Sequence, residues 1–167
     1  VEAVKEGRSI FSNIKKTVHF LLSSNIGEVL TIFAAMVFGW ASPLLPIQLL
    51  WVNLVTDSLP AIALGLDEPE KNIMSRPPEK SGESLFAGGM GLRIFAEGIM
   101  IGALALGAFA IGHIYFDKSA SYVTGRTMAF AVLSISQLFH AYNMRSDKSL
   151  FSVNPFANKH LNTAFLT

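Results

Sequence analysis

The sequence contains no cysteine, and only 15% of its 167 residues are charged. The absence of cysteine excludes disulfide bonds and thiolate metal sites. The formal net charge is +1, whereas a nucleic-acid-binding protein would need a basic face, so we expect no nucleic-acid partner. The sequence also has no phosphate-binding loop, catalytic triad or metal-hydrolase motif. Hydrophobic residues, by contrast, make up 51% of the chain, which is typical of a membrane protein.

Four apolar segments are long enough to cross a membrane, and a fifth begins near the end of the chain. They cover residues 19–39, 43–66, 88–116 and 126–142, with the fifth starting near His160. We therefore predict an all-α, polytopic transmembrane helical bundle of about four full spans plus the start of a fifth. The chain begins without Met, in what reads as the middle of a helix, so we expect it to be a fragment of a larger protein.

The predicted organisation has five parts. A polar stalk helix is expected to continue into the membrane, because no Gly or Pro lies between Arg8 and Asn25. The stalk covers residues 1–18, and a helical hairpin that carries the polar residues covers 19–66. A cytoplasmic loop (67–87) leads to a second helical hairpin (88–144). The last part, residues 145–167, is a cytoplasmic loop with the start of a further helix. The proline-containing loop 67–87 is either a solvated connector or a docking surface for a cytosolic domain.

Orientation follows from the distribution of Lys and Arg. These residues gather before the first span, in the 67–85 region and after residue 145, whereas the turn at residues 40–43 contains none. The positive-inside rule then places the N-terminus and the loops 67–87 and 145–167 in the cytoplasm. We expect the lipid bilayer to be the main environment of the chain.

Asp57 is the only charged residue between Pro43 and Leu66. A carboxylate facing lipid at the bilayer centre costs about 2.5–3.5 kcal/mol on insertion scales, so we expect it to face a polar interior, bind an ion or carry a proton. Asn53, Thr56 and Asp57 stand at i, i+3 and i+4, which places three oxygen-bearing side chains on one helical face. Pro60 cannot donate a hydrogen bond to the Thr56 carbonyl, which predicts a partly unwound helix with a free backbone oxygen.

Two other helices carry polar residues at membrane depth. Asn25 and Glu28 are three residues apart in the first span, and the tight turn is expected to bring their shared face beside Asp57. Gln137 lies in the middle of the fourth span. Two interpretations stay open for these residues: they form hydrogen bonds between helices, or they bind a cation together with Asp57.

Further expectations concern the third span. Arg93 and Glu97 are four residues apart and can form an ion pair. Gly98 and Gly102 form a GxxxG pattern, which indicates close contact with another helix.

The residue types in the polar set indicate the class of metal. The set contains neither Cys nor His, so zinc and copper fit poorly, and Mg²⁺ prefers to keep its waters. Ca²⁺ accepts six to eight oxygen ligands in flexible geometry and fits best. Na⁺, K⁺, Mn²⁺ and H⁺ remain open as alternatives.

Two sequence runs carry a resemblance to a known family. Ser24-Asn25-Ile26-Gly27-Glu28 and Asn53-Leu54-Val55-Thr56-Asp57 resemble the fifth and sixth membrane helices of P-type calcium-transporting ATPases of the sarcoplasmic-reticulum type. The short loops indicate a bacterial member, in the cell membrane. The resemblance implies that Asn25, Glu28 and Thr56 bind a first cation, that Asn53 binds a second, and that Asp57 is shared. Gln137 stands where the family often has Glu, which leaves the number of transported ions open.

The resemblance also implies a function for the parent protein. It would be an ATP-driven pump that exports Ca²⁺ from the cytoplasm, with protons returning on Glu28. ATP and Mg²⁺ would be used by domains outside this sequence, which lacks the phosphorylation motif Asp-Lys-Thr-Gly. Upstream membrane helices and cytosolic domains of the same polypeptide would be its partners. The alternatives are a secondary cation transporter or channel without ATP coupling, a pump for another cation such as Mn²⁺ or Na⁺, and a purely structural bundle.

Overall fold

The structure is a computed structural model. It describes the whole chain except residues 1, 68–72, 76–85, 118–120, 146–158 and 167. Most of the 67–87 loop therefore lies outside the described residues, and so do its predicted roles. All the secondary-structure elements among the described residues are helices. The all-α prediction is confirmed.

The first helix, α1, runs without a break from Glu2 to Val37, so the predicted stalk and the first span form one rod of 36 residues. The chain leaves the helix at Gly39, whose φ of 68° lies in the left-handed region that glycine adopts without steric cost. Residues 40–45, all apolar except Ser42, then connect α1 to the next helix. Because α1 is continuous, a displacement of its N-terminal half is carried into its C-terminal half.

The second span consists of three consecutive helical pieces: α2 (Pro46–Trp51), a π-helix η1 (Val52–Asp57) and α3 (Ser58–Gly65). It begins at Pro46 and not at Pro43, because Pro46 occupies the first helical turn, where its fixed φ suits the helix. The expectation of an unwound segment before Pro60 is wrong in its form. The backbone stays helical there and widens into the π-helix, which directly precedes the turn that contains Pro60.

The second half of the chain forms the other hairpin. After two short 3₁₀ turns, η2 (Ile73–Ser75) and η3 (Ala87–Gly89), come α4 (Met90–Ile111), the π-helix η4 (Gly112–Phe116) and α5 (Val123–Met144). The last helix, α6 (Lys159–Leu166), occupies the region where a further span was expected to start. In length and composition, three stretches of the described chain suit a membrane span: Glu2–Val37, Pro46–Gly65 and Met90–Phe116. The expected fourth span, α5, is 22 residues long but is not among these three.

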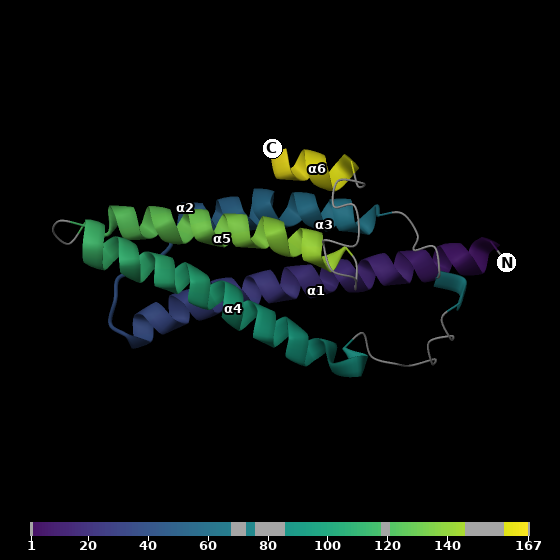
Figure 1. The fold of residues 1–167 in the computed structure, drawn as a ribbon, viewed down its shortest axis with the longest axis horizontal. Coiled ribbons are helices and arrows are strands. Elements are labelled where there is room, and N and C mark those ends of the chain that lie inside the picture. The colour runs from purple at the N-terminus through teal and green to yellow at the C-terminus, as the bar shows by residue number, and fades with distance from the viewer. Residues whose placement is uncertain (1, 68–72, 76–85, 118–120, 146–158, 167) are drawn as a thin grey trace.

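The helices form an elongated bundle in which α4 crosses α1 obliquely while α5 lies along α2 and α3 (Figure 1). Its interior has two apolar clusters. One contains Phe20, Ala61, Ala63, Leu64, Ala141, Tyr142 and Leu161, and the other contains Leu44, Val52, Ile101, Ala105, Phe109, Ala129 and Leu133. Along the second span, Asp57 lies between Val52 of one cluster and Ala61 of the other. Along α5, Gln137 likewise lies between Leu133 and Ala141. The polar residues therefore form a layer between two apolar regions.

Glycines bring α1 and α4 into direct backbone contact. A Cβ atom added to Gly98 would lie 2.5 Å from the Cγ2 of Ile26, and one added to Gly102 would lie 2.9 Å from the carbonyl oxygen of Gly27. Real Cβ contacts are not that short, so no larger residue fits without a shift of the helices. The close contact predicted for the GxxxG pattern is confirmed, and α1 is the helix that approaches it.

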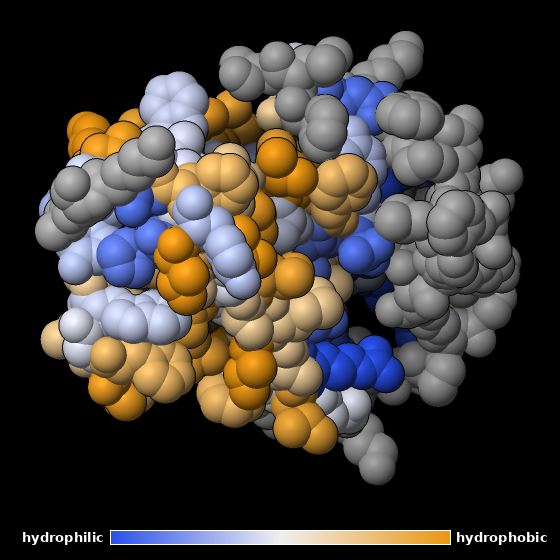
Figure 2. Space-filling view, turned by 60° about the vertical axis from the view of Figure 1, so that its left-hand side comes forward, coloured by the Kyte–Doolittle hydropathy of each residue, from blue (hydrophilic) through white to orange (hydrophobic). Residues whose placement is uncertain are grey.

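The outer surface of the bundle is strongly apolar. Large hydrophobic side chains such as Val29, Phe33 and Met36 on α1 and Leu92 on α4 are more than 60% exposed. Figure 2 shows apolar side chains gathered over one part of the molecule, with hydrophilic ones concentrated beside the grey segments. Such a surface is unfavourable in water and suits the hydrocarbon of a bilayer, as expected of an integral membrane protein.

Candidate cation site

The centre of the polar layer is the carboxylate of Glu28. Glu28 is only 4% exposed, and each of its oxygens accepts one hydrogen bond from an amide. Asn53 Nδ2 donates to Oε2 over 2.9 Å, and Gln137 Nε2 donates to Oε1 over 3.0 Å. The structure thus brings together three of the predicted site residues, which come from α1, η1 and α5.

The second carboxylate, Asp57, is 2% exposed and differs from Glu28 in its partners. Both of its oxygens are buried, and neither has a hydrogen-bond partner among the described residues. Asp57 belongs to the same π-helix as Asn53, which donates to Glu28, so the two acids lie in one region of the bundle. A buried carboxylate without donors is costly, and an ion is one of the few groups that can offset that cost.

Other oxygen-bearing side chains in this part of the bundle are buried as well. Thr56 is 5% exposed and lies beside Asp57 in the sequence of η1. Gln137 Oε1 and the hydroxyls of Ser24 and Ser134 are buried without a hydrogen-bond partner among the described residues. The two serines were not predicted as site residues. Their positions four residues before Glu28 and three before Gln137 place them on the same helical faces, which is the signal that could have found them.

The π-helix explains how η1 presents its side chains. Its wider turn departs from the α-helical spacing on which the i, i+3, i+4 prediction depended. Thr56 and Asp57 are buried, whereas Asn53 is exposed overall and reaches Glu28 only through its amide nitrogen. Asn53 Nδ2 also donates to Leu49 O over 2.9 Å, and Ser58 Oγ donates to Asn53 O over 2.8 Å.

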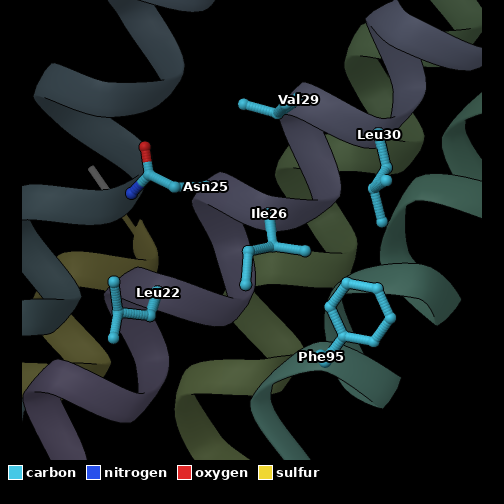
Figure 3. A pocket seen from close by; sticks show the side chains of 6 residues that line it. All are labelled: Leu22, Asn25, Ile26, Val29, Leu30 and Phe95. Atoms are coloured by element: carbon cyan, nitrogen blue, oxygen red, sulfur yellow. The ribbon is translucent and has the colours of Figure 1, made fainter. Parts of the chain in front are cut away.

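Asn25 is the one predicted site residue that the structure does not bring into this layer. It is exposed, and its Nδ2 donates to Leu21 O of its own helix over 2.7 Å. It lines a separate groove of about 300 Å³ with five apolar side chains of α1 and α4 (Figure 3): Leu22, Ile26, Val29, Leu30 and Phe95. Asn25 lies about 60° from Glu28 around α1, on the side that carries this groove and not the polar layer.

The predicted pair of Arg93 and Glu97 is likewise not formed. Arg93 is exposed, and Glu97 instead pairs with His19 of α1, with 2.6 Å between Oε2 and Nε2. The reason is geometric. The glycines of α4 let it pack closely against α1, and this crossing brings His19 beside Glu97, although the two residues are 78 positions apart in the sequence.

The donor set can hold a hard cation but no soft one. No group of three or more His, Cys, Asp and Glu suited to a metal occurs in the part of the chain that the structure describes. The oxygens come instead from two carboxylates, amides and hydroxyls. Such a set fits Ca²⁺, which accepts many neutral oxygens besides carboxylates.

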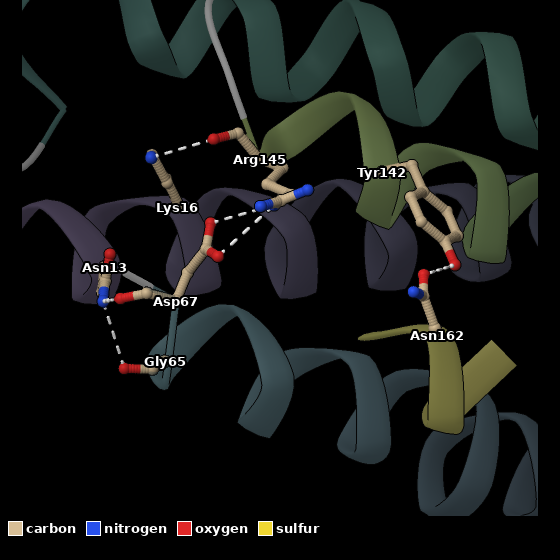
Figure 4. A network of polar contacts seen from close by, with 7 residues as sticks. All are labelled: Asn13, Lys16, Gly65, Asp67, Tyr142, Arg145 and Asn162. Carbon is tan, nitrogen blue, oxygen red and sulfur yellow. Dashed lines mark hydrogen bonds and ion pairs between the residues drawn. The ribbon is translucent and has the colours of Figure 1, made fainter. Parts of the chain in front are cut away.

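A further polar network joins the helices near the N-terminal half of α1 (Figure 4). Asn13 Nδ2 donates to the carbonyl oxygens of Gly65, over 3.2 Å, and Asp67, over 2.8 Å. Arg145 Nε lies 3.3 Å from the Asp67 carboxylate, and Lys16 Nζ donates to Arg145 O over 3.0 Å. The end of α3 and the end of α5 are therefore both tied to α1.

Comparison with known proteins adds to this geometry. Residues 41–167 match the family model described as "Cation transporting ATPase, C-terminus". The chain belongs to this family. The resemblance to P-type calcium-transporting ATPases is thereby confirmed, and this member of the family contributes a C-terminal membrane region.

Individual relatives agree with the family. The chain is 46% identical to "Calcium-transporting ATPase 1" of Bacillus cereus (strain ATCC 10987 / NRS 248), with 96% of the chain and 20% of the relative covered. It is 45% identical to the "Calcium-transporting ATPase" of Bacillus subtilis (strain 168), covering 99% of the chain and 18% of the relative. It is 40% identical to "Calcium-transporting ATPase 4, endoplasmic reticulum-type" of Arabidopsis thaliana, covering 93% of the chain and 14% of the relative. This family member thus spans about a fifth or less of each relative's length.

Proposed function

We propose that this chain is the cation-binding membrane part of an ATP-driven pump that exports Ca²⁺ from the cytoplasm of a bacterium. The observation that carries the proposal is Asp57: a carboxylate 2% exposed, without a hydrogen-bond partner among the described residues, in the same region as the second acid Glu28. Hydrogen bonding between helices alone gives no reason for such a group. The names of the relatives support Ca²⁺ as the transported ion.

The proposed ligands are Glu28, Asn53, Thr56, Asp57 and Gln137, together with Asn25. The amides of Asn53 and Gln137 donate to Glu28 in this structure, but an amide that turns over presents its oxygen instead. The side chain of Asn25 would have to leave its bond to Leu21 O to reach the site. The buried hydroxyls of Ser24 and Ser134 offer additional oxygens. Because Gln137 carries no charge, a single bound cation is as compatible with the site as two.

Energy coupling would pass through α1. We infer that ATP is hydrolysed, with Mg²⁺, by cytosolic domains of the same polypeptide and that their movement acts on the cytoplasmic half of this helix. The rod is continuous, and hydrogen bonds from Asn13 and Lys16 link it to α3 and α5. A tilt of α1 would then shift Glu28 against Asp57 and lower cation affinity. Protons would return on Glu28 as the cation leaves.

The first test is phosphorylation of the full-length pump by ATP in the presence of Ca²⁺, Mn²⁺, Na⁺ or K⁺. Wild type is compared with Asp57→Asn and with the control Asp117→Asn, the same chemical change at a carboxylate in the loop after η4. We expect Ca²⁺ to trigger phosphorylation in wild type and in the control but not in Asp57→Asn.

The other results separate the alternatives. Phosphorylation triggered by Mn²⁺ or Na⁺ would keep the pump and the site but replace the ion. A normal calcium response in Asp57→Asn would exclude Asp57 as a ligand. Cation transport without any phosphorylation would favour a secondary transporter or channel.

A further inference from the structure

A second group of titratable side chains lies between three helices, apart from the cation site. His19 comes from α1, Glu97 from α4 and His140 from α5. His19 Nε2 lies 2.6 Å from Glu97 Oε2, and His140 Nε2 lies 3.7 Å from the same oxygen. The rings of the two histidines are 6.4 Å apart between centroids. One carboxylate oxygen therefore faces two imidazoles.

The group runs from the interior of the bundle toward its surface. The side chain of His140 is 5% exposed, that of His19 13% and that of Glu97 27%. On its inner side, His140 Nε2 lies 2.7 Å from Ser23 Oγ, a fully buried hydroxyl. The ring of Phe20 lies 5.9 Å from the imidazole and packs with apolar residues of α3, a helix that contains no titratable residue.

The remaining charged neighbours lie at the edge of the group. Lys15 and Lys16 precede His19 by about one helical turn, and Lys16 Nζ donates to Arg145 O. Arg93 precedes Glu97 by one turn, is exposed and makes no pair with it. Glu97 thus has the two histidines as its ion-pair partners among the described residues.

The group is one helical turn away from the cation site. His140 follows Gln137 by three residues, about 4.5 Å of helix rise, and Gln137 donates to Glu28. On α1, Ser24 precedes Glu28 by one helical turn, and its buried hydroxyl has no hydrogen-bond partner among the described residues. His19 and Glu97 lie toward the side that the Lys and Arg distribution predicts to be cytoplasmic.

We propose that His140, Glu97 and His19 form a proton relay that carries protons displaced from the cation site to the cytoplasmic side. This inference rests on the proposed function, which supplies the displaced proton. Histidine and carboxylate chains inside membranes serve such transfers because each member can accept a proton and pass it on.

Each transfer step is balanced. His140 accepts the proton and becomes an imidazolium. Glu97 Oε2, 3.7 Å from His140 Nε2, takes it once the two side chains close to hydrogen-bond distance, which forms a neutral carboxyl and restores neutral His140. His19 Nε2 takes it from Oε2 over 2.6 Å and releases its Nδ1 proton to water. An exchange of the His19 tautomer through water then returns all three groups to their starting state. No oxidant, reductant or co-reactant is needed.

The test is stopped-flow measurement of proton release with a pH-indicator dye after Ca²⁺ is mixed with the full-length pump. The variant Glu97→Gln keeps the size of the side chain and a hydrogen bond to His19 but cannot titrate. We expect release to slow by about 100-fold, the lower end of what a positioned acid–base group contributes. Phosphorylation at saturating Ca²⁺, measured on the same samples, should stay as in wild type, because Glu97 is outside the cation site.

Controls decide between a relay and a merely structural role. Arg93→Gln, one turn away on the same helix, should release protons at the wild-type rate, and Glu97→Asp, which keeps a carboxylate, should restore most of the rate. His140→Gln serves as a second test if Glu97→Gln does not fold. Proton release at the wild-type rate in Glu97→Gln or His140→Gln would overturn the relay. Slowing of the same size in Arg93→Gln would also overturn it.

The same experiment separates this inference from the proposed function. A wild-type pump that is phosphorylated with Ca²⁺ but releases no protons would overturn the relay and leave calcium transport standing. A wild-type pump without a calcium response would overturn both.

Discussion

Two faces of α1 contact their neighbours in different ways, one by close packing and the other by hydrogen bonds, although consecutive residues belong to them. Gly27 packs against α4 so closely that an added Cβ would lie 2.9 Å from the Cγ2 of Ile101. Glu28, the next residue, faces η1 and α5 and is held by two amide hydrogen bonds. One face therefore has no room for a methyl group, while the other depends on polar groups that can exchange partners.

This difference indicates which part of the bundle can rearrange. Backbone contact through glycine fixes α1 and α4 relative to each other, because any relative shift creates a clash. Amides can turn, and a π-helix re-aims side chains by small changes in its hydrogen bonds. We infer that α1 and α4 tilt together as a pair, and that the site opens and closes where α1 faces η1 and α5.

The largest expected effect comes from adding a side chain to a glycine in the contact between α1 and α4. For Gly98→Ala we expect a loss of about 1–3 kcal/mol in the free energy of unfolding, the range for overpacked cores. The added Cβ would lie 2.5 Å from Ile26 Cγ2 and 3.1 Å from the carbonyl oxygen of Ser23. The measurement is equilibrium unfolding of the full-length pump in detergent, with the transition assigned to the membrane region.

Gly107→Ala provides the matched control on the same helix. No atom lies within 4 Å of a Cβ added there, so the substitution should raise helix stability by up to about 1 kcal/mol through propensity alone. Equal effects of the two substitutions would show that the crossing of α1 and α4 is not tightly packed.

The polar face is tested by Gln137→Leu, for which we expect a smaller loss of stability. This change removes the donor to Glu28 Oε1 and keeps a side chain of similar size. Hydrogen bonds between membrane helices contribute about 0.6 kcal/mol on average, so the loss should be of that order. Thermal unfolding of the full-length pump without Ca²⁺ gives the value.

Gln137→Glu separates stability from cation binding on this face. It adds a third carboxylate beside Glu28, so we expect lower stability without Ca²⁺ and stronger stabilisation by Ca²⁺. If calcium stabilises Gln137→Glu no more than wild type, the side chain at position 137 is outside the cation shell.

Local features of the sequence predicted much of this comparison. The continuous α1 follows from the absence of helix breakers between Arg8 and Asn25, and the glycine contact follows from the spacing of Gly98 and Gly102. Glu28 and Asn53 could be expected to meet, because a tight turn joins their helices and both lie at similar depth.

The errors concern properties that depend on other helices. Arg93 was expected to pair with Glu97 because both lie on one helix, but a histidine from α1 is the partner. Asn25 was grouped with Glu28 by spacing, yet which side of α1 faces the interior depends on where α4 and α5 pack. The π-helix at residues 52–57 could not be read from the spacing of polar residues, which assumed an α-helix.

The smallest expected effect concerns the start of α5, where Gly125 lies against Gly112 of η4. Asp117 accepts hydrogen bonds from the backbone N–H groups of Thr124 and Gly125, at 2.9 and 3.1 Å. Desolvation acts to raise the pKa of the Asp117 carboxyl, but these hydrogen bonds outweigh it and leave the pKa below its usual value. The carboxylate therefore stabilises the start of α5.

The sign of the pH dependence follows from that lowered pKa. The stabilisation is complete above about pH 4, the ordinary pKa of Asp, and is lost as the pH falls through the lower folded-state value. Hydrogen exchange of the Thr124 and Gly125 amides in the full-length pump, corrected for the intrinsic rate, should lose protection in that acid range. Asp117→Asn should show reduced protection at every pH. If acid instead exposes the amides around Glu28 first, the polar face and not this end of α4 and α5 is the acid-sensitive region of the bundle.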